Sequence, residues 1–549
     1  MALAQAVVAG HANLEPQWSG VTLNLAVLAA ASLAVAGLLQ SRLASDWTAP
    51  AGLPRARLAW LMRLIGWGWV GALLWQPLEY PGYVYAWGSL ALLLAVADRR
   101  SAPGETAIGL SAEWVASMAW IVAAMAAALG AAPAHLQHPA TVVMARLSIA
   151  AVALAASLLS LGRDARRRAA ASALLSLAVF GWLFAVLAEA IARDEPALAV
   201  AQLGLVLAAL SALGLGWLAE RLRWSWPQRL AWAFHAAHLV FAAYVISQAV
   251  ESNQAPSDLH GAIAWAVAWL AYYARFVQAS RSGAELPHSA VAALHVAGLW
   301  TLPAMLAAEA IVQLGAVAGS GWIHASWGAL AAAALWFAAM QPPRWPANAA
   351  PEAYAGVGAN GLAAFASLWL LVAGFGTAGD PAPLPALPLL NPMDVTSLLV
   401  LAALMQWRQL GRLRALADTV LCASIFLIAN LVLLRALHFM AGVGWSVEQW
   451  SHSLLVQASL SILWTLLAMI TMLFAHRRAL RPLWFAGACL LGIVVVKMIA
   501  IDLSGRGTVE RIVSFVAVGL LIMLIGYLTP VPPVRAGILS GARDTESKS

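Results

Sequence analysis

The sequence has 549 residues, of which 62% are hydrophobic and only 10% are charged. Soluble globular domains are about half apolar and a quarter charged, so this composition leaves too little polar surface for a water-facing exterior. The net charge of +7 comes from basic residues in short clusters between apolar segments. That distribution is typical of membrane topology and argues against a nucleic-acid-binding face.

Apolar segments follow one another along almost the whole chain. A hydrocarbon core about 30 Å thick requires about 20 apolar residues in a helix. Windows of that length predict helices near 19–40, 57–75, 80–97, 112–131, 139–161, 169–190, 196–219, 227–250, 259–277, 287–310, 322–340, 352–377, 393–407, 417–439, 449–475, 481–501 and 508–529. The predicted fold is an all-α integral membrane protein, a polytopic helical bundle of about 17 transmembrane helices. The short segment 393–407 and the segment that Pro303 interrupts could instead be re-entrant.

Arginine-rich loops give this bundle a direction. The loop after the first predicted helix, and every second loop from there, together hold most of the 31 basic residues. Lys and Arg accumulate in cytoplasmic loops, so we predict an N-out, C-in orientation. The predicted organisation is a short periplasmic segment over 1–18, a single transmembrane domain over 19–529 and a cytoplasmic tail over 530–549. We expect the first helix to be retained, because no basic region of a cleaved signal peptide precedes it.

Ionisable groups at the edge of the membrane are the candidates for function, because burying them is costly. The hairpin between the last two predicted helices should bring Lys497, Asp502 and Arg511 together at the outer interface. The ligand-binding residues predicted there are Arg435, His438, Lys497, Asp502, Arg511 and Ser514. One interpretation is a basic pocket for a phosphate, carboxylate or sugar headgroup. The other is an ion-pair staple between two helices, with Lys497 reaching to the interface.

Other polar groups have structural interpretations. Arg146 lies about two turns inside its helix and is predicted to form a structural ion pair with Glu189. Asn391 and Asp394 have the order of a helix cap with an acid in the first turn.

Three motifs that resemble chemical sites are better explained by packing. His235, His238 and His295 are predicted to be buried, hydrogen-bonded histidines, since no supporting third ligand or acid is nearby. The G-x-G-x-x-G spelling over 356–361 follows no strand, so it indicates close helix packing. Cys422 and Cys489 lie in apolar segments and offer no thiolate metal site. We predict no metal and no cofactor, and no strong catalytic motif favours an enzyme.

The C-terminal part carries a family resemblance. LNPMD at 390–394 and KMIAIDLSGRGTVERIVSF at 497–515 resemble DUF2339, a bacterial membrane-protein family of unknown function, over about residues 390–534. The resemblance implies a multi-pass protein of the bacterial inner membrane. It also makes the hairpin over 497–514 the distinctive polar feature of the chain.

Three classes of function stay open. The favoured class binds or handles an anionic or sugar-bearing envelope lipid or polymer at the periplasmic face, with the lipid bilayer as its other partner. A secondary transporter should show midplane ionisable groups and broken helices, and only Pro303 clearly interrupts a helix. A membrane-embedded transferase with a periplasmic active site would need an acid in the first outer loop, where Glu79 stands alone. Protein partners are not indicated.

Overall fold

The computed structural model describes residues 55–75, 80–100, 111–129, 139–161, 165–282 and 287–498, with isolated positions at 17–18, 21–22, 35, 78, 516, 519–520 and 523. These residues are almost entirely helical. The exception is a two-residue antiparallel ladder between β1 (Gln17–Trp18) and β2 (Val21–Thr22). The predicted all-α class is confirmed. The chain divides into two compact units, Met1–Val291 and Ala292–Ser549.

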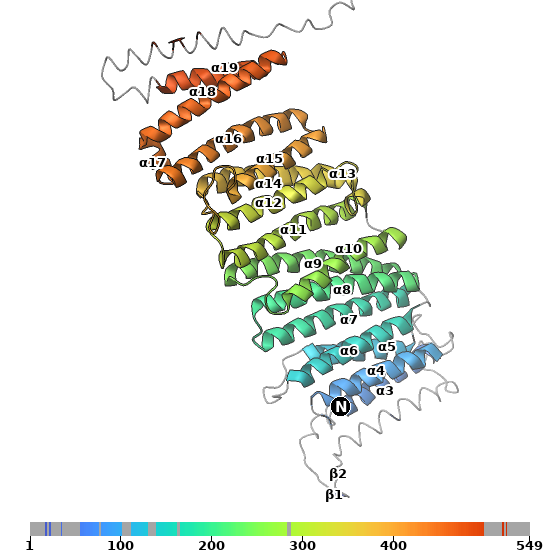
Figure 1. Cartoon of the computed structure of the whole chain (residues 1–549). Coiled ribbons are helices and arrows are strands. Elements are labelled where there is room, and N and C mark those ends of the chain that lie inside the picture. Colours follow the sequence, from blue (N-terminus) through green and yellow to red (C-terminus); the bar gives the residue numbers. More distant parts are fainter. Residues whose placement is uncertain are drawn as a thin grey trace, which may run out of the picture. The chain divides into compact units, whose positions relative to one another are not determined.

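The first unit is a row of helices joined by short connections (Figure 1). They are α3 (Arg55–Trp75), α4 (Gly82–Arg100), α5 (Ala112–Leu129), α6 (Pro139–Ser160), α7 (Ala165–Ala192), α8 (Ala197–Leu222), α9 (Ser225–Ser252) and α10 (Gly261–Ser282). Arg223 and Asn253 end α8 and α9 in the left-handed conformation, with backbone N–H groups bonded to carbonyls of the preceding turn. Such C-caps satisfy the last carbonyls of a helix and redirect the chain, and only two residues, 223–224, separate α8 from α9.

The second unit has the same up-and-down character. Its elements are α11 (His288–Gly315), which begins just before the boundary, α12 (Ser320–Ala338), the 3₁₀ turn η2 (Ala347–Ala349), α13 (Pro351–Ala353), the π-helical η3 (Tyr354–Gly358), α14 (Ala359–Gly376), α15 (Pro392–Gln409), α16 (Arg414–Ala441), α17 (Val447–His452), α18 (Leu454–Arg477) and α19 (Arg481–Lys497). Its core combines α12, α14, α15 and α16 around small residues and Trp369. Asn391 accepts a hydrogen bond from the backbone N–H of Asp394, so the predicted cap of α15 is confirmed.

Every predicted membrane segment within the described residues is helical, although 352–377 and 449–475 are each divided between consecutive helical elements. Eight of the described helices are long and apolar enough to cross a membrane by length and composition. The segment 393–407 is the regular helix α15, and α11 continues through Pro303 for 28 residues. Proline removes one backbone donor, and the rest of the α11 ladder is kept. α11 is among the eight candidate spanning helices and α15 is not, so whether α15 crosses the membrane or is re-entrant stays a prediction. The count of 17, the orientation and the single domain over 19–529 stay predictions.

Helix packing in the first unit is uneven. α6 lies along α7 and α8 lies along α9 in extensive contact, whereas the backbones of α7 and α8 approach each other less closely and share a smaller buried cluster that includes Leu175 and Leu215. A seam consequently separates the α6–α7 pair from the α8–α9 pair. The candidate site lies in this seam.

Candidate functional site

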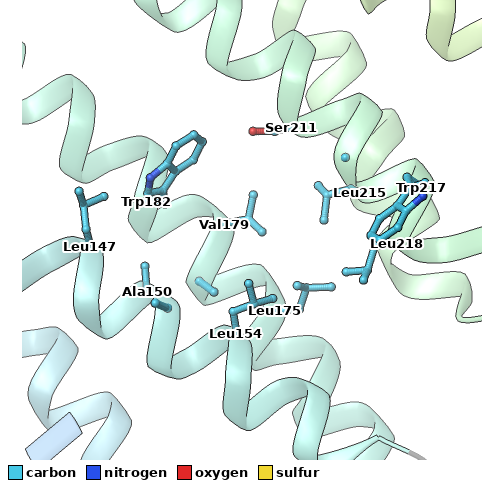
Figure 2. Close-up of a pocket in the computed structure, with 13 residues that line it drawn as sticks. Leu147, Ala150, Leu154, Leu175, Val179, Trp182, Ser211, Leu215, Trp217 and Leu218 are labelled. Carbon is cyan, nitrogen blue, oxygen red and sulfur yellow. The ribbon is translucent and has the colours of Figure 1, made fainter. Parts of the chain in front are cut away.

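An apolar cavity of about 570 Å³ lies between α6, α7 and α8. It is lined by Leu147, Ala150, Ala151, Leu154, Leu175, Ala178, Val179, Trp182, Ser211, Gly214, Leu215, Trp217 and Leu218. Figure 2 shows the rings of Trp182 and Trp217 on opposite sides, with Val179 and Leu215 between them. Ser211 contributes the one polar side chain among these lining residues.

Small residues create this space. Ala150, Ala178 and Gly214 line the cavity from all three helices. A Cβ added at Gly214 would meet no heavy atom within 4 Å, so this glycine faces open space. Trp217 is 60% exposed and Leu154 is 37% exposed, so the cavity reaches the outer surface of the helices. On a membrane-crossing bundle that surface faces lipid.

A second pocket, of about 490 Å³, lies at one end of the same helices. It is lined by the residue that directly follows α6, by the start of α7, by the end of α8 and by the connection from α8 into α9. These residues are Leu161, Arg168, Ala169, Ser172, Leu222, Arg223, Trp224, Ser225 and Trp226. We call this the basic pocket. It brings the α6–α7 and α8–α9 connections together at the same end of the unit.

Among the described residues that line it, the basic pocket has arginines and no carboxylate. Arg168 and Arg223 are exposed, and neither forms an ion pair with a described residue. Arg229 adds a third cation nearby, with its guanidinium carbon 5.8 Å from the centre of the Trp226 ring. An exposed cationic pocket of this kind attracts anions.

The neighbouring Arg167 has a different role. It is buried and forms two hydrogen bonds with Asp98, at 2.5 and 3.0 Å. The Ser111 hydroxyl also donates to this carboxylate. This ion pair fixes the start of α7 against the end of α4, and so helps to position Arg168 at the pocket.

The described members of the predicted outer-face site are engaged inside the second unit. Arg435 is 1% exposed, and its Nη1 donates to Asp394 at 2.6 Å. The His438 ring bonds the Val443 carbonyl through Nδ1 at 2.6 Å. Lys497 donates from Nζ to the Ser461 hydroxyl at 2.7 Å and to the Gln457 carbonyl at 3.1 Å.

These contacts correct the environment expected for Arg435. The acid at the start of α15 reaches it across the helix interface, so this guanidinium is not exposed at an open pocket. Its Nε and Nη2 have no hydrogen-bond partner among the described residues. Asp502, Arg511 and Ser514 lie outside the described residues. A shared outer-face site for all six residues stays a prediction.

The predicted ion pair between Arg146 and Glu189 does not form. Glu189 accepts from Arg193 Nε at 2.9 Å, one turn later in the chain. Arg146 instead donates from Nε to the Ala128 carbonyl at the end of α5, also at 2.9 Å. A partner four residues away on the same helix needs no helix–helix alignment, which explains why Arg193 replaces Arg146.

The glycine-rich spelling packs as predicted and the three histidines are buried as predicted, but neither ring nitrogen of His238 has a hydrogen-bond partner among the described residues. His235, His238 and His295 are at most 2% exposed, and the His235 ring stacks on Tyr272 at 4.0 Å. The Trp300 indole of α11 donates to the Gly358 carbonyl, and Gly361 lies against the same ring. Within the described part of the chain, no three His, Cys, Asp or Glu side chains gather as a metal site requires.

The comparison with known families decides the chain's classification. The family described as a predicted membrane protein, DUF2339, matches residues 108–532. The chain belongs to the DUF2339 family. The match extends far beyond the C-terminal resemblance and includes the cavity and the basic pocket of this DUF2339 protein. No curated protein and no solved structure matches the chain.

No pattern in the sequence by itself pointed to the cavity. Arg168 and Arg223 were interpretable only as topology markers, because nothing in one sequence aligns α7 with α8. One local pattern could have suggested a cavity. Small residues recur on these helices close to Trp182 and Trp217.

Proposed function

We propose that this membrane protein of the DUF2339 family is a multi-pass protein of the bacterial inner membrane that binds an envelope lipid. The acyl chain would occupy the cavity between α6, α7 and α8. The observation that carries the proposal is the apolar lining of that cavity, on three helices that are each long and apolar enough to cross a membrane.

Retention of one lipid cannot come from the hydrophobic effect alone, because the surrounding acyl chains are as apolar as the cavity. It must come from shape and from dispersion contacts. Trp182 and Trp217 provide large rigid surfaces, and Gly214 and Ala178 provide the space between them. The space of about 570 Å³ is open to the outer surface of the helices, so an acyl chain that fits its shape would supply the packing partners that no side chain supplies.

The N-out, C-in orientation belongs to this proposal. The direction rests on the arginine distribution, and the up-and-down alternation that it requires is consistent with alternate connections that meet at one end of a unit. In the first unit, residues 161 and 222–226 line the same pocket. In the second unit, residues within 341–355 and within 409–412 together line another pocket. This orientation puts the lipid site's basic end on the cytoplasmic side, opposite to the outer-face site expected from the sequence.

Filling the cavity tests the proposal. Gly214→Phe places a ring in the open space and should weaken the binding of a phosphatidylglycerol of defined chain length at least tenfold, measured by native mass spectrometry in mild detergent. Gly492→Phe is the matched control, because a Cβ at Gly492 in α19 also meets no heavy atom within 4 Å. A folded Gly214→Phe protein that binds this lipid as the wild type does would overturn the proposal.

A further inference from the structure

We infer that the bound lipid carries an anionic phosphate headgroup, held in the basic pocket by Arg168, Arg223 and Ser225. The inference rests on the proposed function and adds the chemistry of the headgroup. It is carried by a separate observation, a cationic pocket at the end of the same helices as the apolar cavity.

The two spaces follow one another along the seam. On α7, the basic pocket uses Arg168 and Ser172, and the cavity continues from Leu175 to Trp182. On α8, the cavity ends at Leu218 and the basic pocket begins at Leu222. Along a helix, the distance from Arg168 to Trp182 is about 21 Å. One leaflet's share of the hydrocarbon core is about 15 Å, so this length suits one lipid with its headgroup.

The donors in the basic pocket suit a phosphate. Arginine presents planar N–H groups that bind phosphate oxygens in a bidentate way. The Ser225 hydroxyl adds a donor at the first residue of α9, a 28-residue helix whose N-cap, Trp224, makes no side-chain cap bond. The first turn of a helix carries partial positive charge and favours an anion. Trp224 and Trp226 provide the amphipathic rings found at membrane interfaces.

The lining also discriminates between headgroups. Phosphatidylethanolamine carries an ammonium group that would need an acceptor of negative charge, and no described lining residue is acidic. Phosphatidylglycerol carries the same phosphate with an uncharged glycerol. The pocket should therefore prefer the anionic lipid over the zwitterionic lipid when their acyl chains are identical.

Native mass spectrometry with these two lipids tests the inference on the full-length protein. Wild type should bind phosphatidylglycerol at least fivefold more tightly than phosphatidylethanolamine. The double variant Arg168→Gln, Arg223→Gln should lose about fivefold in phosphatidylglycerol affinity per arginine and should lose less phosphatidylethanolamine affinity, so that the preference between the two lipids disappears. Arg221→Gln, Arg281→Gln is the control, because it removes the same charge from exposed positions outside the pocket.

The outcomes separate the headgroup from the lipid proposal. Equal affinity of the wild type for both lipids would overturn the headgroup inference. If Gly214→Phe then weakens the binding of both lipids, the proposal that the cavity binds a lipid still stands. If the control variant loses phosphatidylglycerol as much as the pocket variant, net charge explains the effect and the pocket assignment is wrong. If glycerol 3-phosphate binds wild type and Gly214→Phe as tightly as phosphatidylglycerol binds wild type, the ligand is a free phosphate ester and not a lipid.

Discussion

Arg167 and Arg168 are neighbours in the sequence with opposite environments. The Arg167 side chain is 6% exposed and paired with Asp98, whereas Arg168 is exposed in the basic pocket. Helical geometry points adjacent side chains about 100° apart, so one of them can face the bundle and the other a groove. An arginine cluster that marks topology can therefore also contain a structural ion pair and a ligand-binding group.

The buried pair should be far more important for stability than an exposed one. Asp98→Ala leaves Arg167 buried without its carboxylate and should destabilise the protein by about 3–5 kcal/mol. Asp418→Ala removes the partner of Arg408, a pair in which both side chains are substantially exposed, and should have little effect. Thermal unfolding of the purified protein in detergent measures both. Similar shifts in melting temperature for the two variants would contradict this interpretation.

The positions of several buried polar groups could be predicted from the sequence, but their hydrogen-bond partners could not. The cap at Asn391 and the acid at Asp394 follow local rules and were predictable. The bond from Arg435 to Asp394 joins residues 41 positions apart on two helices. A single sequence has no signal for that alignment, which is why Arg435 was expected at a ligand site. The same lack of an alignment signal explains why Arg146 was wrongly expected to pair with Glu189.

At the scale of the helix, apolar length was a reliable guide to position. The predicted segment 139–161 matches α6, and 417–439 lies within α16. The predicted segment 449–475 is instead divided between α17 and α18 at Ser453. The Ser453 hydroxyl accepts from the Val456 N–H and starts a new helix. Apolar residues continue after this cap, so hydropathy alone could not show the break.

Two glycines of α3 provide a matched test of helix packing. A Cβ at Gly71 would overlap the Trp120 ring of α5, whereas a Cβ at Gly68 would meet no heavy atom within 4 Å. Alanine improves helix propensity by up to about 1 kcal/mol at either position. Gly71→Ala should nevertheless lower the melting temperature, because Trp120 must move, and Gly68→Ala should leave it equal or higher. If both variants gain stability, α3 and α5 do not pack as described.

At the scale of the whole molecule, the candidate site depends on an arrangement of several helices. The cavity exists because the backbones of α7 and α8 approach each other less closely, while each is packed against its other neighbour. The bundle class was predictable from hydropathy, since the membrane-length segments within the described residues are helical. The seam was not predictable. The order of the helices can be read from the sequence, but the sequence does not show which neighbouring helices leave space between them.

Orientation is also a property of the whole chain, and cysteine labelling tests it. Replacing the exposed Cys422 and Cys489 by Ala gives a background for single cysteines at Gln254 and Gln341, both exposed. With the N-terminus outside, a membrane-impermeant maleimide should label Gln254→Cys in intact spheroplasts and label Gln341→Cys only after permeabilisation. The reverse pattern would put the basic pocket on the periplasmic side.

The most direct test of lipid binding in the seam is a cryo-EM map of the full-length protein in phosphatidylglycerol nanodiscs. We predict an elongated density that passes between Trp182 and Trp217 and ends in a headgroup density beside Arg168 and Arg223. This density should be absent in the Gly214→Phe variant. A well-resolved map in which α7 and α8 close over the seam, or in which the seam holds no more density than the surrounding lipid, would contradict the account.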